Sequence, residues 1–596
     1  MPLNPDPPPY LAALNPEQRE AVLHGGGAGM RPHPLLILAG AGSGKTRVII
    51  TKIAWLIREQ GMDPRSILAV TFTNKAAREM VDRARLIEAR AEEAMLRTFH
   101  SFGAWFLRRN GSLGGLDSNF IIYDDDDTIA LLGTIMEDAP RAELRDTAHH
   151  IARAKDYFLG PQDPELDLID YRKEFRRIYA LYEERLARTG NVDFGDLIKK
   201  PVEILRNNPE VAARFRDRFR VILVDEYQDS NVAQFELLKE LRGPNTYVCV
   251  VGDDDQSIYR FRGAEVRNIL EFPERFEGAD IIRLERNYRS VEPILKLAAS
   301  VVDHNQGRLG KTLRAERGPG KIPALVFLPN QDAETAFCGE LIEKSVRDAA
   351  ANYADWAVLY RTNAQSLGFE TELLRRGIPY RVVGSLKFYE REEVKDALAL
   401  LSFMVNPRDE VAFRRVVNKP SRGLGPVALD RITGAAAGDG NEDPVAGGDL
   451  ELAARRLAPE LSAKARSGLA GFLRAIEAGR GSLLAGLVPE SGDPGTGALP
   501  GPAGGPPKKS RGKTSAKSAG ELRAGEGLSV CVVRLVSESG LAAYHLAHDE
   551  IAGNQRIANL QELANAASLY PPSAAGLLEF LEHIELDRSR EEEAAA

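Results

Sequence analysis

The 596-residue chain has only three cysteines, and it lacks any apolar run long enough to span a membrane. Cys249, Cys338 and Cys531 are far apart in the sequence, and no metal-ligand spacing relates them. The first residues lack the basic segment and the apolar segment of a secretory leader. These absences predict a reduced, cytoplasmic protein without membrane contact, and the length predicts several domains.

The chain also lacks a surplus of basic residues. It has 78 lysines and arginines against 86 aspartates and glutamates, so its formal net charge is −8. A domain that binds nucleic acid usually has a basic footprint, and the overall charge therefore argues mildly against such a function. A protein that grips single strands by base stacking in a local basic groove tolerates an acidic exterior.

Glycine, in contrast, is concentrated in one short segment. The sequence AGAGSGKT at residues 39–46 follows an apolar strand pattern at 35–38 and precedes a helical pattern that starts at Val48. Between a strand and a helix, such glycines let backbone N–H groups approach phosphate oxygens. Lys45 would then reach the β- and γ-phosphates, and the Thr46 hydroxyl would bind Mg²⁺. We predict a nucleotide site formed by Ala39, Gly40, Ala41, Gly42, Ser43, Gly44, Lys45, Thr46 and Arg47.

A second buried strand pattern, at residues 221–224, ends in the acidic segment DEYQDS. Open α/β sheets bind their ligands at the carboxyl ends of the strands. We therefore expect Asp225 to hold Mg²⁺ and Glu226 to accept a proton from the attacking water. A solvated acidic loop is the alternative interpretation of this segment.

A third strand pattern, at residues 247–251, is followed by an amide, two aromatic residues and two arginines. Gln256 could sense the γ-phosphate, whereas Tyr259 and Phe261 could stack on nucleic-acid bases. Arginines such as Arg262 could meet the phosphates of a nucleic-acid backbone. The alternative is a surface turn whose aromatic side chains belong to the core.

Four segments, in this order, resemble motifs I to IV of the UvrD/Rep/PcrA superfamily 1 DNA helicases: AGAGSGKT, VDEYQDSN, VVGDDDQSIYRFRGA and LERNYRS. The alanine at position 39, where the generic motif has glycine, is usual in that family. The resemblance implies an ATP-dependent helicase that uses Mg²⁺ and moves 3′ to 5′. It also implies single-stranded DNA, 3′-tailed duplex DNA and accessory proteins of repair or replication as partners, in the cytoplasm at the nucleoid.

Family roles pass to individual residues where the motifs match. Gln18, in LNPEQREAV, matches the glutamine that reads the adenine edge, and Tyr288 matches the residue that stacks on adenine. Arg289 matches a γ-phosphate arginine, so the implied catalytic residues are Lys45, Asp225, Glu226, Gln256 and Arg289. The implied DNA contacts are Phe72, Asn74, His100, Phe194, Tyr259, Phe261 and Arg262. For His100 and Phe194 a place in the core is an equal alternative.

The resemblance predicts an α/β fold with two RecA-like P-loop lobes on parallel sheets, the second incomplete, and two mainly helical insertions. The first lobe would comprise residues 1–103 and 192–283, with the first insertion at 104–191. The N-terminal part of the second lobe would comprise 284–388, with strands at 324–327, 356–360 and 380–383. The second insertion would comprise 389–585, with flexible linkers at 434–448 and 486–527, followed by a tail at 586–596.

No segment of the sequence resembles motifs V and VI of that family. We therefore expect a truncated chain, and three functional hypotheses follow. The first is a UvrD-type helicase or translocase, and the second is a remnant that binds ATP and single-stranded DNA without unwinding duplexes. The third is a subunit of a helicase–nuclease, which the lack of a nuclease-like carboxylate cluster disfavours.

Overall fold

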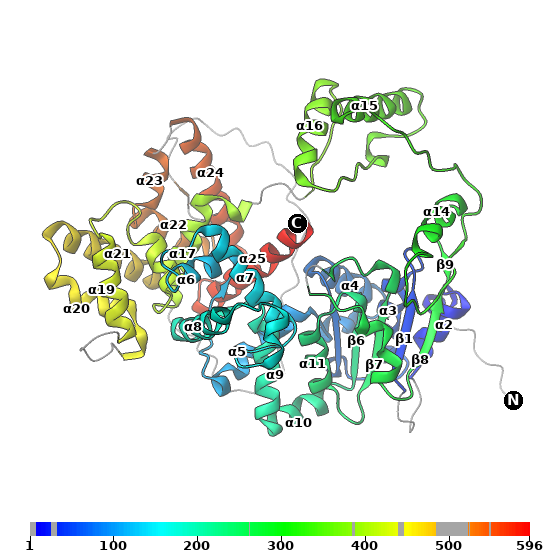
Figure 1. The fold of residues 1–596 in the computed structure, drawn as a ribbon, viewed down its shortest axis with the longest axis horizontal. Coiled ribbons are helices and arrows are strands. Elements are labelled where there is room, and N and C mark those ends of the chain that lie inside the picture. Colours follow the sequence, from blue (N-terminus) through cyan, green and yellow to red (C-terminus); the bar gives the residue numbers. More distant parts are fainter. Residues whose placement is uncertain are drawn as a thin grey trace.

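The computed structural model describes residues 8–595 except 26–32, 261–262, 384–387, 439–445, 484–521, 524 and 548–549. A parallel sheet of six strands, in the order β3-β2-β6-β7-β1-β8, forms the first lobe (Figure 1). Four of these strands are buried along their whole length, which explains their uninterrupted apolar sequences. The strands are β1 (Leu35–Ala39), β2 (Ile67–Thr71), β3 (Met95–Thr98), β6 (Val221–Val224), β7 (Tyr247–Gly252) and β8 (Asp280–Leu284).

Alternate residues of these strands point into two hydrophobic cores, one on each face of the sheet. In β1, Leu35 and Ile37 belong to one core, and Leu36 and Leu38 belong to the other. Helices thus cover both faces, and the loops at the carboxyl ends of the strands are left to form a site. The first core contains α3 (Lys45–Arg58) and α4 (Asn74–Ile87), and the second contains α5 (Phe99–Asn110), α9 (Asp196–Asn207) and α11 (Val232–Leu241).

Residues that lie, in sequence, between strands β3 and β6 of the sheet form a helical body. Its core surrounds the buried side chains of Tyr123, Tyr179 and Tyr182. A short parallel pair, β4 (Ile122–Tyr123) with β5 (Val192–Asp193), joins the start and end of this body. Its helices are α6 (Asp125–Gly133), α7 (Arg141–Asp156) and α8 (Lys173–Thr189). The other α-helices described before residue 284 are α1 (Pro9–Ala12), α2 (Pro16–Leu23), α10 (Pro209–Arg218), α12 (Arg267–Leu270) and α13 (Phe272–Arg275).

The C-terminal part of the chain forms a second helical body around one large core (Figure 1). Its helices are α17 (Glu392–Val405), α18 (Glu410–Val416), α19 (Pro426–Ala437), α20 (Leu450–Leu457), α21 (Ala463–Gly481), α22 (Ser529–Glu538), α23 (Leu541–Ala547), α24 (Glu550–Ala567) and α25 (Ala574–Ala595). Helix α25 continues through residue 586, where the sequence predicted a tail to begin. The linker predicted at 434–448 begins inside α19, and most of that at 486–527 lies outside the described residues.

In the described part of the chain, no single helix is both long enough and apolar enough to cross a membrane. By length and composition alone, α22 and α23 together would pass such a test, but they are bent by 64° at the break between them.

The second lobe differs from the prediction. Between residues 284 and 383, the described strands are β9 (Arg286–Asn287) and β10 (Arg314–Ala315), which pair in parallel. The segments 324–327, 356–360 and 380–383, predicted as strands, do not form strands. Among the described residues no neighbouring strand offers them ladder hydrogen bonds, and Phe327 and Leu359 are 87% and 91% exposed. The helices here are α14 (Glu292–Val302), α15 (Gln331–Arg347) and α16 (Ser366–Arg375).

Candidate nucleotide and nucleic-acid site

The turn between β1 and α3 is shaped by two glycines in the left-handed region, Gly42 with φ 71° and Gly44 with φ 89°. The Ser43 side chain closes the turn, since its hydroxyl donates to the Gly40 carbonyl at 2.7 Å. Lys45 is the first residue of α3, so the N-terminus of that helix faces the turn. Backbone N–H groups at a helix N-terminus favour anions, and this geometry suits a phosphate.

Gln18 lies against this turn. Its side chain is 2% exposed, and its Nε2 donates to the Ser43 carbonyl at 2.8 Å. Its Oε1 accepts from the Asn15 N–H at 3.2 Å, in a capping box at the start of α2. The Asn15 amide in turn donates to the Tyr288 hydroxyl at 2.9 Å. The structure thus brings together the two residues predicted to bind adenine.

Lys45 and Glu226 form a close ion pair, with 2.6 Å between Nζ and Oε2. The same carboxylate oxygen accepts from Gln228 Nε2 at 2.9 Å. Glu226 has φ 50° and ψ 46°, a left-handed backbone that costs energy in a residue other than glycine. Strained residues of this kind cluster at functional sites, and here the strain brings the carboxylate to the lysine of the turn.

Asp225 directly follows β6 and is a buried carboxyl, 6% exposed. Burial, and secondly the charge of Glu226, raise the pKa of Asp225 to about 7. The same two causes raise the pKa of Asp229 to about 7. Asp229 Oδ1 is buried without a hydrogen-bond partner among the described residues. A hydrated Mg²⁺ would favour the charged carboxylates and offer donors to such an oxygen, so this strand end fits the predicted cation.

The contacts continue from β6 to β7. Gln228 Oε1 accepts from the Asp253 N–H at 2.9 Å, and the Asp253 carboxylate accepts from the Gln256 amide. Gly252 permits this approach, because a Cβ there would lie 2.7 Å from Gln228 Oε1. An unbroken chain of contacts therefore runs from Lys45 to Gln256. Gln228 and Asp253 were not predicted as site residues from the sequence, although both lie inside the motifs that contain the predicted ones.

Segments of the second lobe cover the glycine-rich turn. Asn287 Nδ2 donates to the Ala41 carbonyl at 2.5 Å, and the Tyr288 N–H donates to the Gly42 carbonyl at 2.9 Å. A Cβ at Gly42 would lie 2.6 Å from the Cβ of Arg289, whose side chain is exposed. The predicted residues Tyr288 and Arg289 are thus next to the predicted phosphate site.

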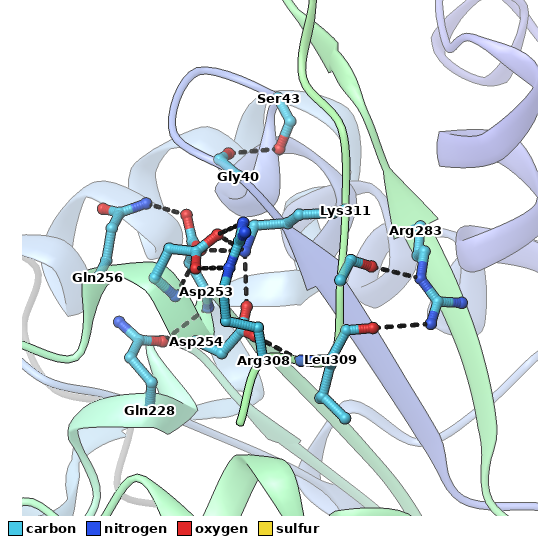
Figure 2. A network of polar contacts seen from close by, with 12 residues as sticks. Gly40, Ser43, Gln228, Asp253, Asp254, Gln256, Arg283, Arg308, Leu309 and Lys311 are labelled. Carbon is cyan, nitrogen blue, oxygen red and sulfur yellow. Dashed lines mark hydrogen bonds and ion pairs between the residues drawn. The ribbon is translucent and has the colours of Figure 1, made fainter. Parts of the chain in front are cut away.

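A basic loop that follows α14 lies on the acidic segment after β7 (Figure 2). Lys311 Nζ lies 2.6 Å from a carboxylate oxygen of Asp253, 2.6 Å from one of Asp254 and 2.5 Å from one of Asp255. Arg308 adds two contacts to Asp255, at 2.6 and 2.9 Å. These cations were not predicted from the sequence, because no local pattern relates them to carboxylates so much earlier in the chain.

The described residues contain two acidic triads with spacing that would suit a metal ion. One is the segment 253–255, and the other comprises Glu183, Asp193 and Asp196. Each triad already contacts the ammonium group of a buried lysine, Lys311 in the first and Lys155 in the second. Each triad is therefore already paired with a lysine, and neither is taken to indicate a further metal site.

Four of the predicted DNA-binding residues form two aromatic pairs. Phe72, after β2, stacks on Tyr259, after β7, with ring centroids 5.6 Å apart and planes 29° apart. His100 of α5 meets the edge of Phe194 at 5.6 Å. All four side chains are half-buried, so each pair presents part of its ring surface to solvent. Phe261 and Arg262, predicted beside Tyr259, lie outside the described residues.

Asn74, the remaining predicted DNA contact, opens α4 beside these pairs. Its Oδ1 accepts from the Ser101 hydroxyl at 3.1 Å, and its Nδ2 donates to Asp587 Oδ1 at 2.9 Å. Asp587 belongs to α25, and it also contacts Arg78 at 3.4 Å. The end of the second helical body therefore lies on a segment predicted to bind DNA.

Comparison with known proteins indicates the same family as the motifs that form this site. Residues 14–277 match the model of the UvrD/REP helicase N-terminal domain, and residues 282–438 match that of the UvrD-like helicase C-terminal domain. The chain is 41% identical over 491 residues to ATP-dependent DNA helicase UvrD1 of Mycobacterium tuberculosis, which covers 79% of this chain and 62% of UvrD1. It is 36% identical over 567 residues to DNA helicase II of Escherichia coli, which covers 93% of this chain and 71% of that protein. ATP-dependent DNA helicase PcrA of Bacillus subtilis is 39% identical over 436 residues, with 72% of this chain and 58% of PcrA covered.

The chain thus spans less than two thirds of the length of UvrD1 and PcrA. On these matches, and on the four motifs gathered around the glycine-rich turn, this chain belongs to the UvrD/REP helicase family.

Proposed function

We propose that this chain hydrolyses ATP at the glycine-rich turn and couples the reaction to movement along single-stranded DNA, as a UvrD-type helicase or translocase. Family membership and the names of the relatives support this proposal. The observation that carries the coupling is the chain of contacts from Lys45 to Gln256. Tyr259 follows three residues later and stacks on Phe72, so the nucleotide site and the aromatic pair share one loop.

In this proposal each group of the site has a separate task. Lys45 neutralises charge on the phosphates, and Glu226, held by Gln228, accepts the proton of the attacking water. Gln256 and Arg289 meet the γ-phosphate, and Gln18 and Tyr288 hold the adenine. A Mg²⁺ ion held by Thr46 and Asp225 would supply charge neutralisation between the β- and γ-phosphates.

The same proposal assigns the nucleic-acid side of the reaction. Phe72 and Tyr259 would stack on successive bases, an interaction that every base can make and that therefore tolerates any sequence. We infer 3′ to 5′ polarity, action on single-stranded and 3′-tailed duplex DNA, and a role beside repair or replication proteins at the nucleoid. These finer assignments rest on the family alone.

Strand separation tests the proposal directly. A chain that moves 3′ to 5′ is expected to unwind a duplex with a 3′ single-stranded tail when ATP and Mg²⁺ are present. It should leave a duplex with a 5′ tail intact, and Lys45→Ala should abolish unwinding of the 3′-tailed duplex. Unwinding of the 5′-tailed substrate alone would contradict the inferred polarity.

A second candidate function is ATP and single-stranded DNA binding without unwinding. The limited sheet between residues 284 and 383 favours it, because the described part of this lobe has only the β9–β10 pair. A lobe with so little sheet is a poor rigid body for closing on a bound phosphate. ATP hydrolysis that DNA stimulates, without separation of either duplex, would support this second function over the first.

A further inference from the structure

Lys311 is an enclosed cation near the nucleotide site. Its side chain is 3% exposed, and its ammonium group contacts the carboxylates of Asp253, Asp254 and Asp255 (Figure 2). Burial disfavours the charged amine, but the three carboxylates outweigh it and raise the pKa of Lys311. A lysine that stays charged in such a place fixes the carboxylates around it, since Asp253 and Asp254 would otherwise be enclosed charges without a cation.

Asp253 is the residue through which this cation reaches the site. Its Oδ1 contacts Lys311 at 2.6 Å and accepts from the Asp255 N–H at 3.1 Å. Its Oδ2 accepts from the Gln256 amide, and its own N–H donates to Gln228. Asp253 thus connects the cation of the second lobe with both glutamines of the first, with Gln256 through its carboxylate and with Gln228 through its backbone N–H.

We propose that Lys311 is a positioning residue of the nucleotide site, which holds Asp253 and through it fixes the Gln256 amide and the Gln228–Glu226 pair. This inference rests on the proposed ATP hydrolysis at the same site. Lys311 lies on the second lobe, and Leu313, two residues later, packs against Gly40 of the turn. The position of that lobe is thereby linked to Gln256, the glutamine predicted to sense the γ-phosphate.

The test uses Lys311→Met, which keeps the length of the side chain and removes its charge. ATP turnover at saturating ATP, Mg²⁺ and single-stranded DNA should fall about ten- to a hundredfold, the cost of a small misplacement of catalytic groups. The affinity for a fluorescent ATP analogue should change little, because Lys311 does not contact the glycine-rich turn. In a Gln256→Ala background the same substitution should have little further effect on turnover.

Arg308→Met is the matched control, because Arg308 contacts Asp255 in the same triad but not Asp253. It should retain most of the ATP turnover. Equal losses of ATP turnover in the Arg308 and Lys311 variants would overturn the proposal. So would a Lys311 effect that is undiminished in the Gln256→Ala background. In either case Lys311 would only help the two lobes to dock.

Hydrogen exchange separates this inference from the proposed function. Lys311→Met should accelerate exchange of the backbone amides of residues 253–256, and Arg308→Met should accelerate it less. If the wild-type chain hydrolyses no ATP, the proposed function fails, but accelerated exchange still supports positioning by Lys311. If hydrogen exchange is unchanged in Lys311→Met, the positioning role is wrong, whether or not the chain hydrolyses ATP.

Discussion

At the scale of single residues, Glu226 carries the most specific geometry of the site. Its left-handed backbone directs one carboxylate oxygen to both Lys45 and Gln228. Glu226→Gln keeps the shape of the side chain but cannot accept a proton, so we expect turnover to fall about 10²–10⁴-fold. Nucleotide binding, measured with a fluorescent ATP analogue, should be preserved.

Asp225→Asn is the matched variant, one residue away on the same strand end. It should lower the affinity for the nucleotide in the presence of Mg²⁺ as well as turnover, because a neutral amide is a poor ligand for the cation. Steady-state hydrolysis and Mg²⁺-dependent binding of the analogue measure both effects. Equal losses of Mg²⁺-dependent affinity in the two variants would refute this division of roles.

The raised pKa of Asp225 also predicts a stability that depends on pH. Its pKa is about 7 in the folded chain and near 3.8 when exposed, so the folded state holds an extra proton between these values. Stability contributed by this group is complete below pH 4 and is lost as pH rises through 7. Asp225→Asn cannot ionise, and its Oδ1 still accepts from the Glu226 N–H.

We therefore expect Asp225→Asn to melt at a higher temperature than the wild type at pH 8, without Mg²⁺ or nucleotide. The gain has an upper bound of about 4 kcal/mol, since one pKa unit corresponds to about 1.4 kcal/mol. It should shrink as pH falls toward 4. A variant that melts lower than the wild type at pH 8 would show that ionised Asp225 does not destabilise the fold.

At the scale of elements, the ends of β2 and β7 bring Phe72 and Tyr259 into contact. If this pair is a stacking platform, Tyr259→Ala should weaken binding of single-stranded DNA by about 1–3 kcal/mol, with little dependence on base sequence. Fluorescence anisotropy with labelled oligonucleotides measures the change. Tyr171→Ala is a suitable control, because Tyr171 is an 88% exposed aromatic away from this pair. If both variants bind single-stranded DNA equally well, Tyr259 has a role in the core and not in DNA binding.

The elements of the first lobe could be predicted because their signals are local. Strand patterns at 35–38, 221–224 and 247–251 each end in polar motifs, and a parallel sheet brings such ends to one edge. The predicted strand at 324–327 failed because a strand also needs a neighbour, which a local pattern does not report. The role of Lys311 could not be predicted for the same reason, since it depends on contacts between distant segments.

At the scale of the whole molecule, helix α25 joins the second helical body to the first lobe. Glu582 pairs with Arg108 at 3.2 Å, and Asp587 accepts from Asn74. If Asn74 binds DNA, Asp587→Ala should raise the affinity for single-stranded DNA by roughly 0.5–1.5 kcal/mol, the usual net contribution of one hydrogen bond. Glu582→Ala should not, since Arg108 is outside the predicted DNA contacts. Unchanged affinity in the Asp587 variant would argue against DNA at Asn74.

The central claim is that ATP hydrolysis at the glycine-rich turn is coupled to DNA at the Phe72–Tyr259 pair. The most direct measurement is the steady-state ATPase rate of the purified chain with and without single-stranded DNA, beside the Lys45→Ala and Tyr259→Ala variants. DNA should stimulate the wild type, Lys45→Ala should abolish hydrolysis, and Tyr259→Ala should weaken the stimulation while keeping the rate without DNA. Hydrolysis that DNA does not change, or that persists in Lys45→Ala, would contradict the claim.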